Sequence, residues 1–150
     1  MRICKVALDT PLRQLFDYTL PPELADAQPG ARVRVPFGRQ QLVGILVEHA
    51  QTSTLPQEKL RAVAAVLDNT PLLGAADLQL LVWAANYYHH PIGEVFAAAL
   101  PRHLREGRGP GAPQPIWSIS AEGHASLSVA TRSRAPRQQQ LLEWLARTGS

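Results

Sequence analysis

The stretch QLFDYTLPPELADAQPGARVRVPFGRQQLVGILVE, residues 14–48, decides the fold. Apolar and β-branched residues favour strands at 15–20, 31–38 and 42–50, and turn-forming residues fill the segment between the first two. In the second strand, valines alternate with Arg32 and Arg34. Side chains alternate between the two faces of a strand, so we expect the valines in a core and both arginines in water.

Further strands are expected on both sides of this stretch. RICKVAL at residues 2–8 is rich in β-forming residues, and KLRAVAAVLD at 59–68 is ambiguous but favours a strand ending near Asp68. Gly44, inside the strand at 42–50, indicates a bulge or a close backbone approach. Five short, closely spaced strands predict a small closed or half-closed barrel.

Two helices are expected after the barrel. Apolar residues recur at helical spacing through LLVWAANYY near residues 78–88, and they cover most of the helix surface, which predicts a helix buried on most sides and packed on the barrel. Pro91 ends this helix, and a shorter one is expected at 93–100, before Pro101.

The last third of the chain changes character. Residues 106–115 are rich in Pro, Gly and Arg and are expected to form a linker. IWSIS at 116–120 predicts a short strand. Residues 136–148 predict a helix with Pro136 in its first turn and Gly149 at its C-terminal cap. The apolar face of that helix needs a partner surface. We therefore predict an α+β, mainly β chain: a β-barrel-like domain with a packed helical pair over 1–105, a linker over 106–115, and an incomplete second domain over 116–150.

Composition limits the functional classes. Hydrophobic residues make up 45% and charged residues 18%, and the single Cys4 excludes a disulfide framework or a cysteine zinc cluster within this chain. No secretory signal and no membrane-spanning segment are evident, so we expect a soluble cytoplasmic chain. The net charge is +3, and residues 101–150 hold seven Lys or Arg against three Asp or Glu. Such a basic tail either follows phosphates or is a solvated linker.

Catalysis by this chain is not expected. The sequence contains no phosphate-binding nucleotide loop and no convincing nucleophile and base, so we predict no cofactor. His89 and His90 are adjacent, and neighbouring residues on a helix point about 100° apart, which makes a shared metal ion unfavourable. We predict no metal site.

Asp17 is the unusual residue, because it lies between Phe16 and Tyr18 in an apolar run, where a carboxylate without a partner is costly. In one interpretation it turns outward, accepts backbone hydrogen bonds or pairs with an arginine. In the other, it accepts a hydrogen bond from a hydroxyl that the chain does not supply. Phe16 offers a stacking face, Gly38 a bare backbone and Arg61 a cation, and together these residue types describe a pocket for one nucleotide.

The motifs FDYTLPPEL, PGARVRVPFG and YYHHPIG, in this order and spacing, make residues 6–105 similar to the N-terminal region of the PriA family of bacterial replication-restart helicases. The resemblance implies a domain that binds the 3′-hydroxyl end of the nascent leading strand at stalled or abandoned forks. The family's 3′-end pocket maps onto Phe16, Asp17, Gly38 and Arg61. Arg61 replaces a lysine, which keeps the charge but changes its geometry. Supporting residues would be Leu15, Tyr18 and Arg39.

The resemblance also implies properties beyond this chain. Family members unwind DNA in the 3′-to-5′ direction with ATP and magnesium, hold zinc, act at the nucleoid, and work with single-strand-binding protein and other primosome proteins. Residues 116–150 resemble the opening of a winged helix that contacts duplex DNA. The alternative from another functional class is a small-barrel protein-interaction scaffold with a basic linker.

Overall fold

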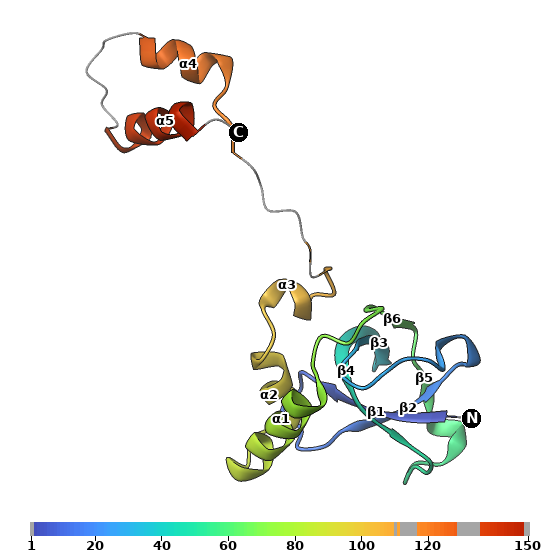
Figure 1. The fold of residues 1–150 in the computed structure, drawn as a ribbon. Helices are drawn as coiled ribbons and strands as arrows, with labels where there is room; N and C mark the ends of the chain where they lie inside the picture. Colours follow the sequence, from blue (N-terminus) through green and yellow to red (C-terminus); the bar gives the residue numbers. More distant parts are fainter. Residues whose placement is uncertain (1, 110, 112–116, 129–135, 149–150) are drawn as a thin grey trace. The chain divides into compact units, whose positions relative to one another are not determined.

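The computed structural model describes residues 2–109, 111, 117–128 and 136–148, and the chain divides into two compact units, Met1–Gly111 and Ala112–Ser150. The first unit holds all of the strands found in the described residues (Figure 1). They are β1 (Arg2–Leu8), β2 (Phe16–Leu20), β3 (Arg32–Phe37), β4 (Gln40–Ala50), β5 (Arg61–Ala62) and β6 (Ala65–Val66). Its helices are α1 (Ala75–Tyr87), α2 (Ile92–Ala98) and α3 (Arg102–Arg105), with 3₁₀ turns at Pro22–Leu24 and Gln57–Lys59.

The six strands form one curled sheet in the order β5-β2-β1-β4-β3-β6. Neighbours are antiparallel except β5, which runs parallel to β2. Residues 61–66, the closing segment, supply β5 at one edge and β6 at the other. Between them, Val63 N–H donates to the Thr19 carbonyl at 2.9 Å and Ala64 N–H donates to the Arg34 carbonyl at 2.8 Å. One short segment therefore bridges both edges of the sheet, and the predicted small barrel of an α+β fold is confirmed.

Two glycines set how closely the layers approach. A Cβ atom on Gly44 would lie 2.5 Å from the Ala7 carbonyl oxygen, while the register shift of the β1–β4 pair falls elsewhere, between Lys5 and Val6. Gly44 thus marks a close approach and not a bulge. A Cβ atom on Gly93, at the start of α2, would lie 1.5 Å from the Leu8 carbonyl oxygen. The helix can pack this tightly on β1 only because position 93 has no side chain.

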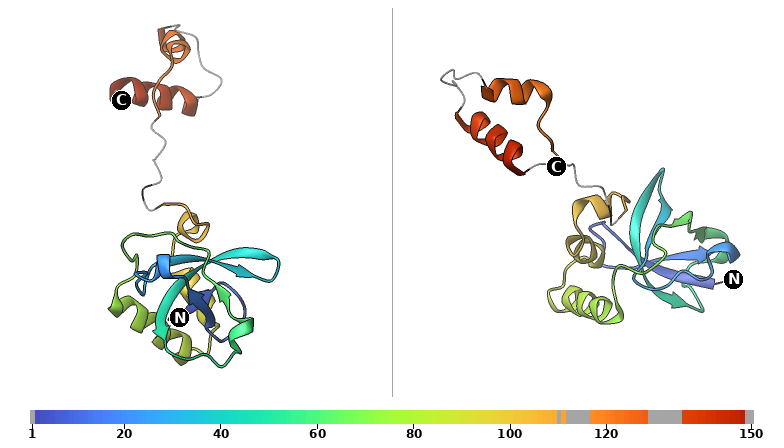
Figure 2. Two further views of the ribbon diagram at one scale, coloured as in Figure 1. Left: turned by 90° about the vertical axis from the view of Figure 1, so that its right-hand side faces the viewer. Right: turned by 45° about the horizontal axis from the view of Figure 1, so that its top comes forward.

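Helices α1 and α2 pack together on one side of the sheet (Figure 2). The prediction that α1 is buried on most sides is wrong, because within it only Leu78 and Ala85 are buried, whereas Leu80, Trp83 and Tyr87 are 59%, 54% and 64% exposed. The sheet and α2 cover one side of α1 only. The indole of Trp83 instead stacks on the ring of Tyr87, with centroids 5.0 Å apart.

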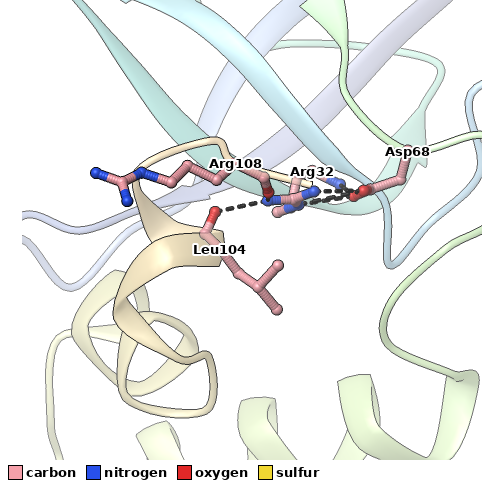
Figure 3. A network of polar contacts seen from close by, with 4 residues as sticks. All are labelled: Arg32, Asp68, Leu104 and Arg108. Atoms are coloured by element: carbon pink, nitrogen blue, oxygen red, sulfur yellow. Dashed lines mark hydrogen bonds and ion pairs between the residues drawn. The ribbon is translucent and has the colours of Figure 1, made fainter. Parts of the chain in front are cut away.

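The prediction that Arg32 faces water is also wrong: the residue is fully buried, while Arg34 is half-buried. The Arg32 guanidinium donates to both carboxylate oxygens of Asp68, at 2.6 Å through Nη2 and at 2.9 Å through Nε. The backbone N–H of Arg32 donates to the same carboxylate at 2.9 Å. Nη1 donates to the carbonyls of Leu104, at 2.7 Å, and Arg108, at 2.6 Å (Figure 3). The segments around α3 and Asp68 fold over this face of β3 and exclude water.

Asp68 stays charged in this environment. Burial alone raises the pKa of a carboxyl group, but the hydrogen bonds and charge of Arg32 together outweigh it and lower the pKa of Asp68. The pair satisfies a buried cation and a buried anion at once, and it ties β3 to the C-terminal end of the first unit.

The second unit contains α4 (Ala121–Ser128) and α5 (Pro136–Thr148), which pack against each other. The α5 helix matches the predicted range, but Gly149 lies outside the described residues. Gly123 admits the side chain of Leu142, so α4, which was not predicted, supplies part of the surface that α5 needs. The described residues of IWSIS, 117–120, form no strand, and Ile116 lies outside the described residues.

Candidate nucleic-acid interface

An open pocket of about 370 Å³ lies at the end of the barrel where β2 and β5 begin and β3 ends. The four residues predicted for a nucleotide pocket, from three separate stretches of the chain, all line it: Phe16, Asp17, Gly38 and Arg61. Leu15 and Tyr18 line it as well, whereas Arg39 does not and is exposed in the adjoining turn. The curled sheet therefore brings together six of the seven predicted residues.

Aromatic rings form one wall of this pocket. The rings of Phe16 and Phe37 meet edge to face, with centroids 5.2 Å apart, and both residues are half-buried. Tyr18 donates its hydroxyl hydrogen to the Pro36 carbonyl at 3.0 Å, and burial raises the pKa of this phenol to about 12. Tyr18 is thus fixed as a neutral wall residue, while the phenylalanines leave apolar surface open to the pocket.

Gly38 is the first residue of the two-residue turn between β3 and β4. Its φ of 60° fits a type II′ hairpin turn, in which this position favours glycine. The Arg61 guanidinium donates through Nη1 to the Gly38 carbonyl at 3.1 Å. This bond links the hairpin turn between β3 and β4 to the start of the closing segment, and it fixes the distance between these two sides of the pocket.

Asp17 is half-buried and lines the same pocket. Ser53 donates its hydroxyl hydrogen to Asp17 Oδ2 at 2.5 Å, and the Leu55 N–H donates to Ser53 Oγ at 3.0 Å. The chain therefore does supply one hydroxyl to Asp17, contrary to the prediction that it supplies none. Among the described residues, no arginine or lysine forms an ion pair with Asp17, which removes the predicted alternative of an arginine partner.

Two cations lie on this pocket, although only Arg61 was predicted. Lys59 lines it, is exposed, and has no salt-bridge partner among the described residues. Residues two apart in a strand point to the same side, so the strand predicted over 59–68 could have indicated Lys59 and Arg61 as a pair. Ser53 gave no such indication, because it lies 36 residues from Asp17 in a polar loop without periodicity.

The predicted absence of a metal site remains a prediction. Within the described parts of the chain, no group of three or more His, Cys, Asp or Glu side chains lies together. His90 pairs with Glu94 at 2.9 Å, and Arg13 donates to His89 Nδ1 at 3.0 Å, so the two histidines have different partners. No described helix is long and apolar enough to cross a membrane.

Comparison with known proteins gives consistent matches. The family model of the PriA 3′ DNA-binding domain (3′BD) matches residues 5–101. Replication restart protein PriA of Haemophilus influenzae is 38% identical over 149 residues, which cover 99% of this chain and 20% of that protein. PriA of Buchnera aphidicola from Acyrthosiphon pisum is 32% identical over 104 residues, 69% of this chain and 14% of the relative. Probable replication restart protein PriA of Mycobacterium tuberculosis H37Rv is 33% identical over 134 residues, which cover 81% of this chain and 20% of that protein.

Proposed function

The chain belongs to the family of PriA 3′ DNA-binding domains, and from this premise we propose that it binds DNA by recognising the 3′-hydroxyl end of the nascent leading strand at stalled or abandoned replication forks. The observation that carries the proposal is the convergence of Phe16, Asp17, Gly38 and Arg61 on one open pocket. These residues offer an apolar face, an acceptor, exposed backbone and a cation, which match the parts of a terminal nucleotide.

Asp17 provides the selectivity for the end. A 3′-terminal nucleotide differs from an internal one by its free hydroxyl, and an ionised carboxylate only accepts hydrogen bonds. It therefore favours a hydroxyl donor and repels a 3′-phosphate. A hydrogen bond to a charged group contributes about 1.5–3 kcal/mol, which corresponds to roughly tenfold to hundredfold selectivity.

The other pocket residues bind without reading the base sequence. A base can stack on Phe16 or Phe37 whatever its identity, for about 1–3 kcal/mol per base. Arg61 and Lys59 place positive charge where the preceding phosphate of a bound strand would pass, and phosphate contacts fix position but carry no sequence information. The pocket would thus read the chemistry of the strand end.

The proposal is tested by fluorescence anisotropy with short single strands that differ only in a 3′-hydroxyl or a 3′-phosphate. We expect the chain to bind the hydroxyl end roughly tenfold to hundredfold more tightly. Asp17→Ala should weaken hydroxyl-end binding by a similar factor and should not weaken binding of the phosphate end. Equal affinity of the unsubstituted chain for both ends would contradict end recognition and leave a general phosphate binder.

The chain spans about a fifth or less of the length of these curated relatives. We propose that it acts within a longer PriA-type protein, an ATP-dependent 3′-to-5′ helicase that uses magnesium and holds zinc outside this chain, at the nucleoid in the cytoplasm. Single-strand-binding protein and other primosome proteins are its proposed partners. We also propose that residues 116–150 form the opening of a winged helix, which the packing of α4 against α5 supports.

One observation favours the alternative of a protein-interaction scaffold. The outer side of α1 exposes Leu80, Trp83 and Tyr87, and Tyr88 beyond its end is 71% exposed. A contiguous exposed apolar surface is typical of interaction sites. Salt separates the two functions, because DNA binding weakens steeply as salt rises and binding through an apolar surface does not.

A further inference from the structure

We propose that Ser53 is a specificity-determining positioning residue, which holds one oxygen of the Asp17 carboxylate so that the other oxygen faces the 3′-hydroxyl of a bound DNA end. The inference rests on the proposed function, since it assigns a role within the same pocket. It concerns a residue that does not itself line that pocket.

The direction of the Ser53 hydrogen bond follows from its two partners. A serine hydroxyl has one hydrogen to donate and can also accept. The Leu55 N–H donates to Ser53 Oγ at 3.0 Å, and a carboxylate cannot donate, so the hydroxyl hydrogen points to Asp17 Oδ2 at 2.5 Å. The backbone of the loop after β4 thereby orients the serine, and the serine orients the carboxylate.

The two carboxylate oxygens therefore differ. Oδ2 has a charge-assisted partner at the short end of the usual range, whereas no hydrogen bond to Oδ1 is found among the described residues. The terminal torsion of an aspartate is broad, so a half-buried carboxylate without such a partner would sample many orientations. With Ser53 in place, the open acceptor is held before the ligand arrives, which reduces the ordering cost of binding.

Ser53→Ala removes the hydroxyl with little change in volume, and the loop offers matched controls. Ser53→Thr keeps a hydroxyl at the same position. Thr52→Ala removes the hydroxyl on the other side of Ser53, and Thr52 is exposed, lies outside the pocket lining and has no hydrogen bond to Asp17. Thermal unfolding of each variant, followed by circular dichroism, establishes that the barrel is intact.

The experiment compares strands ending in a 3′-hydroxyl with strands ending in a 3′-deoxy group, which lacks only the hydroxyl. The readout is the ratio of the two dissociation constants for the whole chain, measured by anisotropy. We expect Ser53→Ala to reduce the preference for the hydroxyl end by about two- to tenfold and to leave deoxy-end affinity unchanged. Ser53→Thr should restore the preference, and Thr52→Ala should retain it.

Each contrary outcome has its own meaning. If the unsubstituted chain does not distinguish the two ends, 3′-hydroxyl recognition is wrong and the role of Ser53 is overturned with it. If that chain distinguishes them and Ser53→Ala does so equally well, only the role of Ser53 is overturned. Tighter binding of the hydroxyl end by Ser53→Ala would show that the serine competes for the carboxylate, and equal loss on both ends would assign it to loop structure alone.

Discussion

Asp68 and Asp17 are two carboxylates of the same small barrel, held in opposite ways. Asp68 is buried and accepts hydrogen bonds on both oxygens from one arginine, Arg32, and from the backbone of that residue. Asp17 is half-buried at the mouth of a pocket, and a single serine donates to one of its oxygens. Both oxygens of the first carboxylate are occupied, whereas one oxygen of the second accepts no hydrogen bond from the described residues.

This difference separates a structural carboxylate from a recognition carboxylate. A buried charge is tolerated only when its partners replace the water that it loses, and Arg32 does this for Asp68. A charge at the edge of a pocket can stay partly solvated until a ligand replaces that water. Substitutions at Asp68 should therefore affect folding, and substitutions at Asp17 should affect binding.

The largest expected effect comes from Arg32→Met, which leaves Asp68 as an uncompensated buried charge. Breaking a buried ion pair in this way costs about 3–5 kcal/mol of the free energy of unfolding, measured by urea denaturation. Asp17→Ala is the matched comparison, expected to cost only about 1 kcal/mol because it removes one hydrogen bond at a half-buried site and leaves no buried charge without a partner. Comparable destabilisation by both substitutions would remove the distinction between the two carboxylates.

A smaller effect is expected from acid. The pKa of Asp68 is lowered below its usual 3.8 in the folded chain, so its charge stabilises the fold above that value, and this contribution is lost as pH falls through the folded pKa. The loss should be smaller than for Arg32→Met, because a protonated carboxyl still accepts hydrogen bonds. Urea denaturation between pH 5 and 2 should show a shallower acid slope for Asp68→Asn than for the unsubstituted chain. Identical slopes would show that Asp68 does not contribute to acid sensitivity.

The smallest expected effect is at Lys59. If its ammonium neutralises one phosphate of a bound strand, Lys59→Gln should weaken DNA binding modestly and reduce the slope of log affinity against log salt by about 0.7. Arg39→Gln is the matched control, since Arg39 is a nearby exposed cation outside the pocket lining. An equal change in the two slopes would place the strand across the hairpin turn, and an unchanged slope for Lys59→Gln would remove that residue from the interface.

The sequence predicted the barrel because strand alternation and turn residues are local properties that persist in the fold. The prediction failed for Arg32, whose alternation placed it opposite the buried valines but could not show that α3 and Asp68 cover that face. The prediction of burial failed for Trp83 and Tyr87, because apolar composition does not show how many sides of a helix other elements will cover. Both errors concern which surface another part of the chain covers, and that is decided by tertiary packing.

The residues of the candidate pocket also fall into those that the sequence indicated and one that only tertiary packing placed. Phe16, Asp17 and Gly38 belong to strands and a turn with recognisable patterns, Arg61 was expected as the cation of a nucleotide pocket, and the family resemblance maps onto the same four residues. Ser53 lies in a polar loop whose path no periodicity determines, so its bond to Asp17 became visible only in the folded chain.

The closing segment, residues 61–66, also protects the sheet from other molecules. An exposed strand edge is a template for pairing with a second chain, and here the two short strands of one segment, β5 and β6, pair with β2 and β3. Cleavage of the peptide bond between Val63 and Ala64 would therefore threaten two edges at once and release the strand that carries Arg61 to the pocket. Resistance to aggregation and the ability to hold a DNA end would then be lost in a single event.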